Sequence, residues 1–443
     1  MSDIPLSSQL IEWSEFLNSY SSSADFYTRL ASVFIDSSSV WTKIFLEKDN
    51  WRNIQELEKA WLSKCHDIFD SRFREEVFVN SLSNAVECYS KLARATGLGQ
   101  LYQNISNMTS VWNNLFMEPL RDTILRTPSH QIHSEGKFSL YHYNQITDTK
   151  ENSKIPLLII YGFINRHYIL DLLPQVSIVR NLLEQGVDIF STDWGTPSAY
   201  DQDLTLGHYI NNYLDNSIEQ IRKHTNSEKV SLFGYCWGGD LALIYAALHP
   251  EKIKNVITLA TPGDFSVDDG LLTLWTKRMN ADSMVDTFGN VPSMILNAAF
   301  ALRSPIDFLH KYPHYFEKPR DIESIMKFFA TEMWLYDSPP VIGEIYRQFV
   351  KDCYQQNLLI KNQMKIGEDM LVDLKRITMP FLNIVASNDD LVAPESSKAL
   401  SNAVGSEDNS FMEFKSGHVG ACIGSQAHKE LWPKVGNWLI SRS

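Results

Sequence analysis

The ten residues Ser231–Asp240, SLFGYCWGGD, join a short apolar strand to the start of an apolar helix through a turn with glycines on both sides of one residue. In the G-x-S-x-G pattern, a strained turn of this kind exposes the central side chain as a nucleophile. The central residue here is Cys236, so the pattern predicts a reactive thiol. A small buried cysteine is the alternative interpretation. Gly234, Gly238 and Gly239 favour the nucleophile, because they let strand and helix cross closely.

A thiol nucleophile needs a base to take its proton and an acid to orient that base. Asp389 follows a predicted strand in VASNDDLVAP, and His418 follows the next predicted strand in FKSGHVG. Nucleophile, acid and histidine therefore occur in the chain order of the α/β-hydrolases. Asp390 competes with Asp389 for the acid, and the D-x-x-V spacing to Val392 favours Asp389. For His418, a loop histidine with only a structural hydrogen bond is the alternative.

Acyl transfer also needs N–H donors for the oxygen that becomes negative in the transition state. The backbone N–H of Trp237, at the start of the helix after the turn, is one expected donor. The second is expected from the loop after LLIIYG, around Phe163 and Ile164. When a cysteine attacks a thioester it forms another thioester of nearly equal energy, so the acyl group stays activated. Cys236 therefore suits acyl transfer from a thioester to an alcohol better than simple ester hydrolysis.

Strands and helices alternate along the part of the chain that must position these residues. We expect strands at 137–144, 156–162, 187–195, 229–235, 255–261, 380–387 and 410–416, where the sequence alternates with a period of two or is wholly apolar. Helices are expected at 177–186, 206–224, after Cys236, at 394–404 and at 429–440. This β-α-β rhythm is typical of a parallel sheet covered on both faces.

The order of elements divides the chain into parts. Residues 1–118 have helical periodicity and predict an N-terminal helical domain, and residues 119–443 predict an α/β-hydrolase catalytic domain. The strand rhythm lapses between about 263 and 377, which predicts a helical cap inserted over the carboxyl edge of the sheet. The expected fold class is thus α/β, with an α/β-hydrolase fold, a helical cap and an N-terminal helical domain.

Composition excludes several classes of function. The chain has 40 Lys and Arg against 53 Asp and Glu, a net charge of -13, which argues against nucleic acid as the main partner. No basic leader or apolar stretch of membrane-spanning length is visible. Its 5 cysteines lack C-x-x-C spacing, which fits a reducing cytoplasm. Histidine spacing predicts no metal site, and no P-loop or dinucleotide fingerprint predicts a cofactor.

Several further segments carry a resemblance to a known family. They are YGFINRHYILDL (161–172), TDWGTPS (192–198), GYCWGGD (234–240), AALHPEKIKNVITLATPGDF, EMWLYDSPPVIGEIYRQF (332–349), MPFLNIVASNDDLVAP and SGHVG. With these segments the chain, from about Leu120 to its end, resembles the polyhydroxyalkanoate (PHA) synthases, most of all the short-catalytic-subunit (class III) type. The resemblance departs at Asp390, where short-type enzymes often have a histidine.

The resemblance implies that (R)-3-hydroxyacyl-CoA, with 3-hydroxybutyryl-CoA as the favoured monomer, is polymerised into polyester with release of CoA. Carried onto this sequence, Cys236 holds the growing chain as a thioester and His418 activates Cys236. Asp389 either assists His418 or activates the 3-hydroxyl of the monomer. A cysteine-dependent thioesterase or depolymerase of the same fold is the alternative enzyme. A non-catalytic granule scaffold is the alternative of another class, and the intact order of Cys, Asp and His argues against it.

The resemblance also implies partners and a location. The protein is expected in the cytoplasm at the surface of PHA granules, in contact with the growing polyester. A homodimer is the expected assembly, and a second helical synthase subunit is an alternative partner. The N-terminal helical domain could replace that subunit, bind a partner, aid granule attachment, or simply stabilise the catalytic domain or a dimer.

Overall fold

The computed structural model describes residues 127–146, 156–268, 270–303 and 322–443. The expected N-terminal helical domain, 1–118, lies outside these ranges. Within them, Arg278–Thr287 fall in a separate compact unit, which carries most of helix α12 (Ala281–Phe288). All other described residues belong to one unit, Ile124–Lys277 with Phe288–Ser443. The sheet and the candidate site lie in this second unit.

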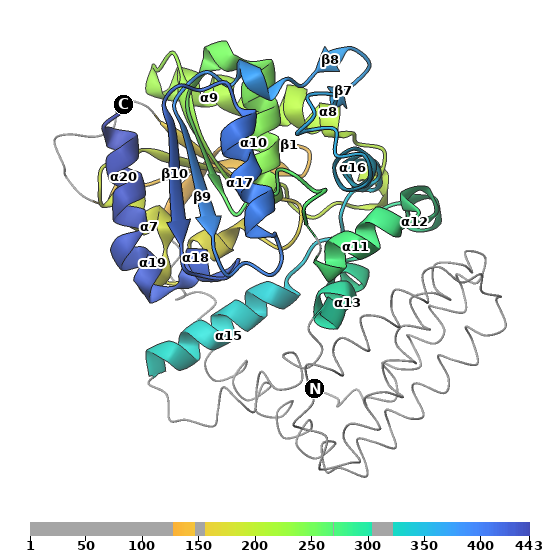
Figure 1. Cartoon of the computed structure of the whole chain (residues 1–443). Coiled ribbons are helices and arrows are strands. Elements are labelled where there is room, and N and C mark those ends of the chain that lie inside the picture. The colour runs from red at the N-terminus through yellow and green to blue at the C-terminus, as the bar shows by residue number, and fades with distance from the viewer. Residues whose placement is uncertain (1–126, 147–155, 269, 304–321) are drawn as a thin grey trace, which may run out of the picture. The chain divides into compact units, whose positions relative to one another are not determined.

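The described residues form a sheet of eight strands in the order β1-β2-β4-β3-β5-β6-β9-β10 (Figure 1). The strands are β1 Ser129–Glu135, β2 Phe138–Tyr143, β3 Leu157–Ile160, β4 Ile189–Asp193, β5 Val230–Tyr235, β6 Ile253–Leu259, β9 Phe381–Ala386 and β10 Asn409–Phe414. From β4 to β10 every neighbouring pair is parallel. The carboxyl ends of these parallel strands therefore meet at one edge.

All seven expected strands are present, and the sheet is parallel from β4 to β10, as the β-α-β rhythm predicted. β1 pairs antiparallel with β2, and β2 pairs antiparallel with β4. β1 was not among the expected strands, because the first expected strand was 137–144. Its sequence, SHQIHSE, contains a single aliphatic residue, and its side chains are exposed or half-buried at the sheet edge. A strand that buries neither face has no hydrophobic period to detect.

Helices cover both faces of the sheet (Figure 1). On one face, α7 (Ile178–Leu183) packs against α20 (Trp432–Ile440), next to α19 (Ser425–Glu430) and α18 (Gly420–Ile423). The other face carries α9 (Asp215–Thr225), α10 (Trp237–Leu248) and α17 (Pro394–Ala403). The helix expected at 206–224 is continuous but varies in winding, with α8 (Leu206–His208) and a π-helical segment, η6 (Tyr209–Leu214), before α9.

Alternate side chains of the central strands form the core beneath α7 and α20. Leu157 and Ile159 of β3, Phe233 and Tyr235 of β5, Ile257 and Leu259 of β6, and Leu382 and Ile384 of β9 belong to one buried cluster with those helices. Helix α10 lies on the opposite face and is itself wholly apolar in its middle, so it is buried on nearly all sides. This burial gives the residues at its start a rigid support.

Between β6 and β9 the described chain is mostly helical. It contains α11 (Leu271–Arg278), α12, α13 (Ser293–Arg303), α15 (Ile322–Tyr336), α16 (Gly343–Phe349), a π-helical segment η8 (Val350–Gln355), the hairpin β7 (Lys365–Ile366) and β8 (Met370–Leu371), and η9 (Leu374–Arg376). We call this segment the cap, with its expected limits of about 263–377. Within the described ranges, no helix combines the length and apolarity that crossing a membrane requires.

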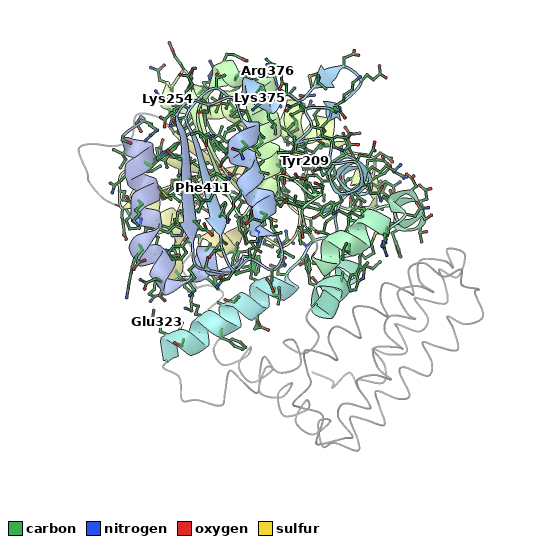
Figure 2. All side chains as sticks on the ribbon, viewed as in Figure 1. Tyr209, Lys254, Glu323, Lys375, Arg376 and Phe411 are labelled. Atoms are coloured by element: carbon green, nitrogen blue, oxygen red, sulfur yellow. The ribbon has the colours of Figure 1, made fainter. Side chains whose placement is uncertain are left out.

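The last strand, β10, forms the open edge of the sheet. Its side chains alternate between exposed and half-buried, and Phe411 is 45% exposed (Figure 2). Because β5, β6, β9 and β10 run parallel, the residues after β9 and after β10 lie at the same carboxyl edge as the turn after β5. We call this turn, which carries Cys236, the elbow. This arrangement brings three distant segments of the sequence together.

Candidate active site

Cys236 occupies the turn between β5 and α10 in a strained backbone conformation. Its φ of 53° and ψ of -129° lie outside the regions that non-glycine residues normally adopt. Its N–H donates to the carbonyl of Leu259 in β6 at 3.0 Å, and its own carbonyl accepts from Gly239 at 2.8 Å. A conformation of this kind costs about 1–3 kcal/mol and persists only where the surroundings enforce it. Its thiol is half-buried and not in a disulfide.

Two glycines after Cys236 are needed for space. A Cβ on Gly238 would overlap the carbonyl oxygen of Ile160 at the end of β3, and one on Gly239 would overlap the side chain of Thr261. Neither glycine has a positive φ, so the requirement is steric and not conformational. The backbone of α10 thus starts in direct contact with the ends of β3 and β6. This contact fixes where the Cys236 side chain emerges.

His418 and Asp389 meet at the same edge of the sheet. The Nδ1 atom of His418, in the loop after β10, lies 2.7 Å from Oδ2 of Asp389, in the loop after β9. Their side chains are only 8% and 2% exposed, respectively. The other oxygen of Asp389 accepts from the backbone N–H groups of Leu391 and Val392, both at 2.9 Å. Asp390, the competing acid, has an exposed side chain.

The second ring nitrogen of His418 is left for the thiol. Burial lowers the pKa of His418, but the charge of Asp389, the charge of Cys236 and hydrogen bonds to both side chains outweigh it and raise that pKa to about 10. A protonated imidazole is therefore favoured at His418, between Asp389 and Cys236. The structure thus brings together Cys236, His418 and Asp389, which come from three separate segments of the sequence.

The expected oxyanion donors lie on two elements that touch. Trp237 is the first residue of α10, so its backbone N–H has no partner within the helix. Gly162, which follows β3, packs against it: a Cβ on Gly162 would lie 3.6 Å from the Trp237 backbone nitrogen. Phe163 and Ile164 come next in this loop, which we call the oxyanion loop (161–165). Phe163 is buried, with its ring 5.2 Å from that of Tyr209 of η6, and Ile164 is half-buried.

Sequence reasoning missed two buried tyrosines beside the site. The Tyr235 hydroxyl donates to the backbone carbonyl of His418 at 3.4 Å, and its ring lies 5.0 Å from the imidazole. The ring centres of Tyr161 and Tyr235 lie 5.8 Å apart, and both side chains are almost fully buried. Burial, with the nearby cysteines adding to it, raises the pKa of both phenols well above the usual value. The signal was present in the sequence, because each tyrosine ends an apolar strand, but an apolar strand end also fits plain core packing.

Asp240, the last residue of the GYCWGGD motif, has an environment that the sequence did not predict. Its side chain is fully buried in the first turn of α10, and neither carboxylate oxygen has a hydrogen-bond partner among the described residues. Burial, and after it the charge of Cys236, raises the pKa of Asp240 well above its usual value. The carboxyl group is therefore held in its neutral form close to the thiol.

A solvent-accessible pocket lies beside the oxyanion loop. It is lined by residues of that loop, of the segment after β4 and of the cap, namely Tyr161–Phe163, Asn165–His167, Thr192–Gly195, Pro197, Tyr209 and Pro339–Ile342. Cys236 is not among the lining residues, so the pocket adjoins the site without containing the thiol. In the described part of the chain, no group of three or more His, Cys, Asp or Glu side chains is placed to hold a metal ion.

Comparison with known proteins decides the family. A sequence model of the α/β-hydrolase fold matches residues 155–421, and one of the N-terminal part of poly-beta-hydroxybutyrate polymerase (PhaC) matches residues 96–182. The poly(3-hydroxyalkanoate) polymerase subunit PhaC of Allochromatium vinosum is 38% identical over 346 residues, or 78% of this chain and 94% of that protein. The chain belongs to the PhaC family. The expected α/β-hydrolase fold and the resemblance to PHA synthases are both confirmed.

Two other PhaC relatives place the match in context. The PhaC subunit of Synechocystis is 39% identical over 71% of this chain and 85% of its own length. That of Haloferax mediterranei is 40% identical over 72% of this chain, but the match covers only 65% of the relative. The PhaC N-terminal match begins at residue 96, earlier than the resemblance that the sequence analysis placed from about Leu120. The expected boundary at 118 thus lies inside a segment that the PhaC family shares.

Proposed function

We propose that this protein polymerises (R)-3-hydroxyacyl-CoA, with 3-hydroxybutyryl-CoA as the favoured monomer, into polyester and releases CoA. The observation that carries the proposal is the thiol on a strained elbow within reach of a buried His418–Asp389 pair, in a chain of the PhaC family. A thiol nucleophile keeps the acyl group at thioester energy, which a hydroxyl can still attack. A serine on the same elbow would form a more stable oxygen ester.

In the first proposed step, the Cys236 thiolate attacks the thioester carbonyl of the substrate. The carbonyl oxygen becomes negative, and the backbone N–H of Trp237 with an N–H of the oxyanion loop stabilises it. The bond from the carbonyl carbon to the CoA sulfur then breaks. His418 gives its proton to the departing CoA thiolate, so the products are free CoA and an acyl group bound to Cys236 as a thioester.

In the second proposed step, the 3-hydroxyl of an incoming (R)-3-hydroxyacyl-CoA attacks the thioester on Cys236. His418, now neutral, takes the hydroxyl proton as an ester bond forms and the bond to the Cys236 sulfur breaks. This step leaves a Cys236 thiolate, a protonated His418 and a chain that is one monomer longer on CoA. A new attack by Cys236 on that CoA thioester returns the longer chain to the enzyme and releases CoA.

The contacts of Asp389 favour one of its two possible roles. One oxygen is bound to His418 and the other to two backbone N–H groups, while the side chain is 2% exposed. A carboxylate that already accepts three hydrogen bonds and is 2% exposed offers a substrate hydroxyl little access. We therefore propose that Asp389 orients His418 and stabilises its positive charge, and that His418 alone activates the 3-hydroxyl.

The proposal is tested by giving the purified full-length protein (R)-3-hydroxybutyryl-CoA, measuring CoA release, and sorting the acyl product into free acid and polymer. We expect CoA release with polymer, and a loss of more than about 10³-fold in Cys236→Ala. The control is Cys65→Ala, which removes a thiol far from Cys236 in the sequence and should remain active.

Other outcomes of this assay would contradict the proposal in different ways. Free 3-hydroxybutyrate without polymer would make the protein a thioesterase. Equal CoA release by the wild type and Cys236→Ala would exclude the thiol as nucleophile. Polymer formed by the protein alone would also support a synthase that needs no second subunit. Because the growing polyester would stay attached to Cys236, the protein would then be located at the granule surface.

A further inference from the structure

The side chain of the residue after the nucleophile docks on the cap. The indole of Trp237 is 5% exposed and stacks on Phe349, the last residue of α16, with ring centres 4.1 Å apart and planes 28° apart. Its Nε1–H donates to the hydroxyl of Tyr354 in η8 at 3.3 Å. The oxyanion mechanism needs only the backbone of this residue. That mechanism therefore does not account for the buried, hydrogen-bonded side chain.

The opposite side of Trp237 is held by the oxyanion loop. A Cβ on Gly162 would lie 3.2 Å from the Trp237 Cβ, tighter than most such contacts. The residue is thus fixed between Gly162 on one side and Phe349 with Tyr354 on the other. These contacts restrict both the indole and the first residue of α10 that carries it.

Tyr354 itself is anchored to the segment that follows β6. Its ring lies 4.5 Å from that of Phe265, which is buried. The side chain of Asn357, just after η8, accepts from the Phe265 N–H at 3.0 Å and donates to Asp264 at 2.7 Å. η8 is π-helical, a form that is rare and frequent at functional sites. Tyr354 is therefore held in place by the part of the cap that directly follows β6.

We propose that Trp237 and Tyr354 form a positioning pair that couples the cap to the reacting thiol. The hydrogen bond from indole to hydroxyl holds the first residue of α10 in place, and with it the direction of the backbone N–H that binds the oxyanion. The inference rests on the acyl transfer proposed above, in which that N–H acts. In this arrangement, Tyr354 is a positioning residue, since it acts through Trp237 and not on the substrate.

The test compares Tyr354→Phe, Trp237→Phe and the double variant in the full-length protein. We expect Tyr354→Phe to lower kcat for CoA release about tenfold, the effect of one lost hydrogen bond, while KM stays within about twofold because the acyl-CoA contacts are unchanged. The double variant should be no slower than the slower single variant, because both changes break one interaction. If the loss of kcat in the double variant equals the product of the two single losses, the two side chains act independently and the proposal is overturned.

A second readout does not depend on polymerase activity. The rate at which iodoacetamide alkylates Cys236, followed by mass spectrometry of its peptide, should change by about threefold or more in both single variants if the elbow loosens. A wild type without CoA release would refute the proposed function, whereas the alkylation rates would still decide the coupling. An unchanged kcat together with an unchanged alkylation rate in Tyr354→Phe would overturn the proposed coupling between the cap and Cys236.

The matched control is Tyr245→Phe on the same helix. The Tyr245 hydroxyl donates to Asp215 at 2.6 Å, so this variant also removes one tyrosine hydrogen bond from α10. It should lower the thermal unfolding midpoint without changing kcat or the alkylation rate. An equal loss of kcat in Tyr245→Phe would show that any weakening of α10 slows the enzyme, and the specific role of Tyr354 would be refuted.

Discussion

Asp240 has the least favourable environment of any residue in the elbow motif. An ionised carboxylate that is fully buried and has no hydrogen-bond partner would cost several kcal/mol, so the group stays protonated instead. The neutral form also spares Cys236 a second negative charge on the same helical turn. A residue one turn from Cys236 thus adds no negative charge beside the thiol.

The neutral state of Asp240 predicts a specific pH dependence of stability. Because the folded pKa is raised, the unfolded chain loses this proton near pH 4 while the folded chain keeps it. The free energy of unfolding should therefore fall by about 1.4 kcal/mol per pH unit from about pH 4 up to the folded pKa. Asp240→Asn cannot ionise, so its stability relative to the wild type should rise with pH from about pH 4 and level off at the folded pKa, as measured by urea unfolding at a series of pH values. A difference that does not change with pH would show that Asp240 is ionised in the folded protein.

Single residues also show how far sequence reasoning could reach at this scale. Cys236 and His418 could be selected because each follows a strand within a glycine-flanked motif. The choice between Asp389 and Asp390 depended on a spacing argument, and the hydrogen bond to His418 now distinguishes them. The docking of Trp237 on Tyr354 could not be predicted, because the two residues are 117 positions apart and no local pattern links them.

At the scale of elements, the start of α10 depends on contacts with two neighbouring strands. The helix begins so close to the ends of β3 and β6 that Gly238 and Gly239 have no room for a Cβ. The strained φ of Cys236 is enforced by this packing and by its hydrogen bond to Leu259. The geometry of the thiol is therefore a property of three elements and not of the turn alone.

Gly238→Ala tests this packing directly. Its Cβ would overlap the carbonyl oxygen of Ile160, a backbone atom that cannot rotate away. We expect a loss of about 3 kcal/mol or more in stability, measured by urea unfolding. The control is Gly207→Ala, whose Cβ would lie 3.5 Å from the nearest atom, an ordinary contact, and which should change stability little. A Gly238→Ala variant as stable as Gly207→Ala would contradict the account of the elbow.

The strands illustrate why some elements could be predicted and one could not. β3, β5, β6 and β9 are buried on both faces, so their apolar runs gave a clear signal. β1 lies at the edge with a polar sequence, and only its pairing with β2 makes it a strand. Its antiparallel direction likewise follows from tertiary pairing, which composition does not encode.

For the whole molecule, the order of strands and helices in the sequence predicted a parallel sheet covered by helices, because such sheets allow few connections. The chain order of Cys236, Asp389 and His418, with the family resemblance, narrowed this prediction to an α/β-hydrolase fold. The exact limits of the domains and of the cap stay predictions. The cap contributes Phe349 and Tyr354 to the contact with the elbow, although these residues stand far from Cys236 in the sequence. The fold thus uses an insertion to complete a site whose core comes from the sheet.

The most direct test of the central claim is to detect the acyl group on Cys236. The full-length protein is mixed with isotopically labelled (R)-3-hydroxybutyryl-CoA, quenched rapidly in acid, digested and mapped by mass spectrometry. We predict label on the peptide that contains Cys236, removed by neutral hydroxylamine as expected for a thioester, and absent in Cys236→Ala. Label on another residue, or polymer formation without any labelled Cys236 peptide, would contradict the claim.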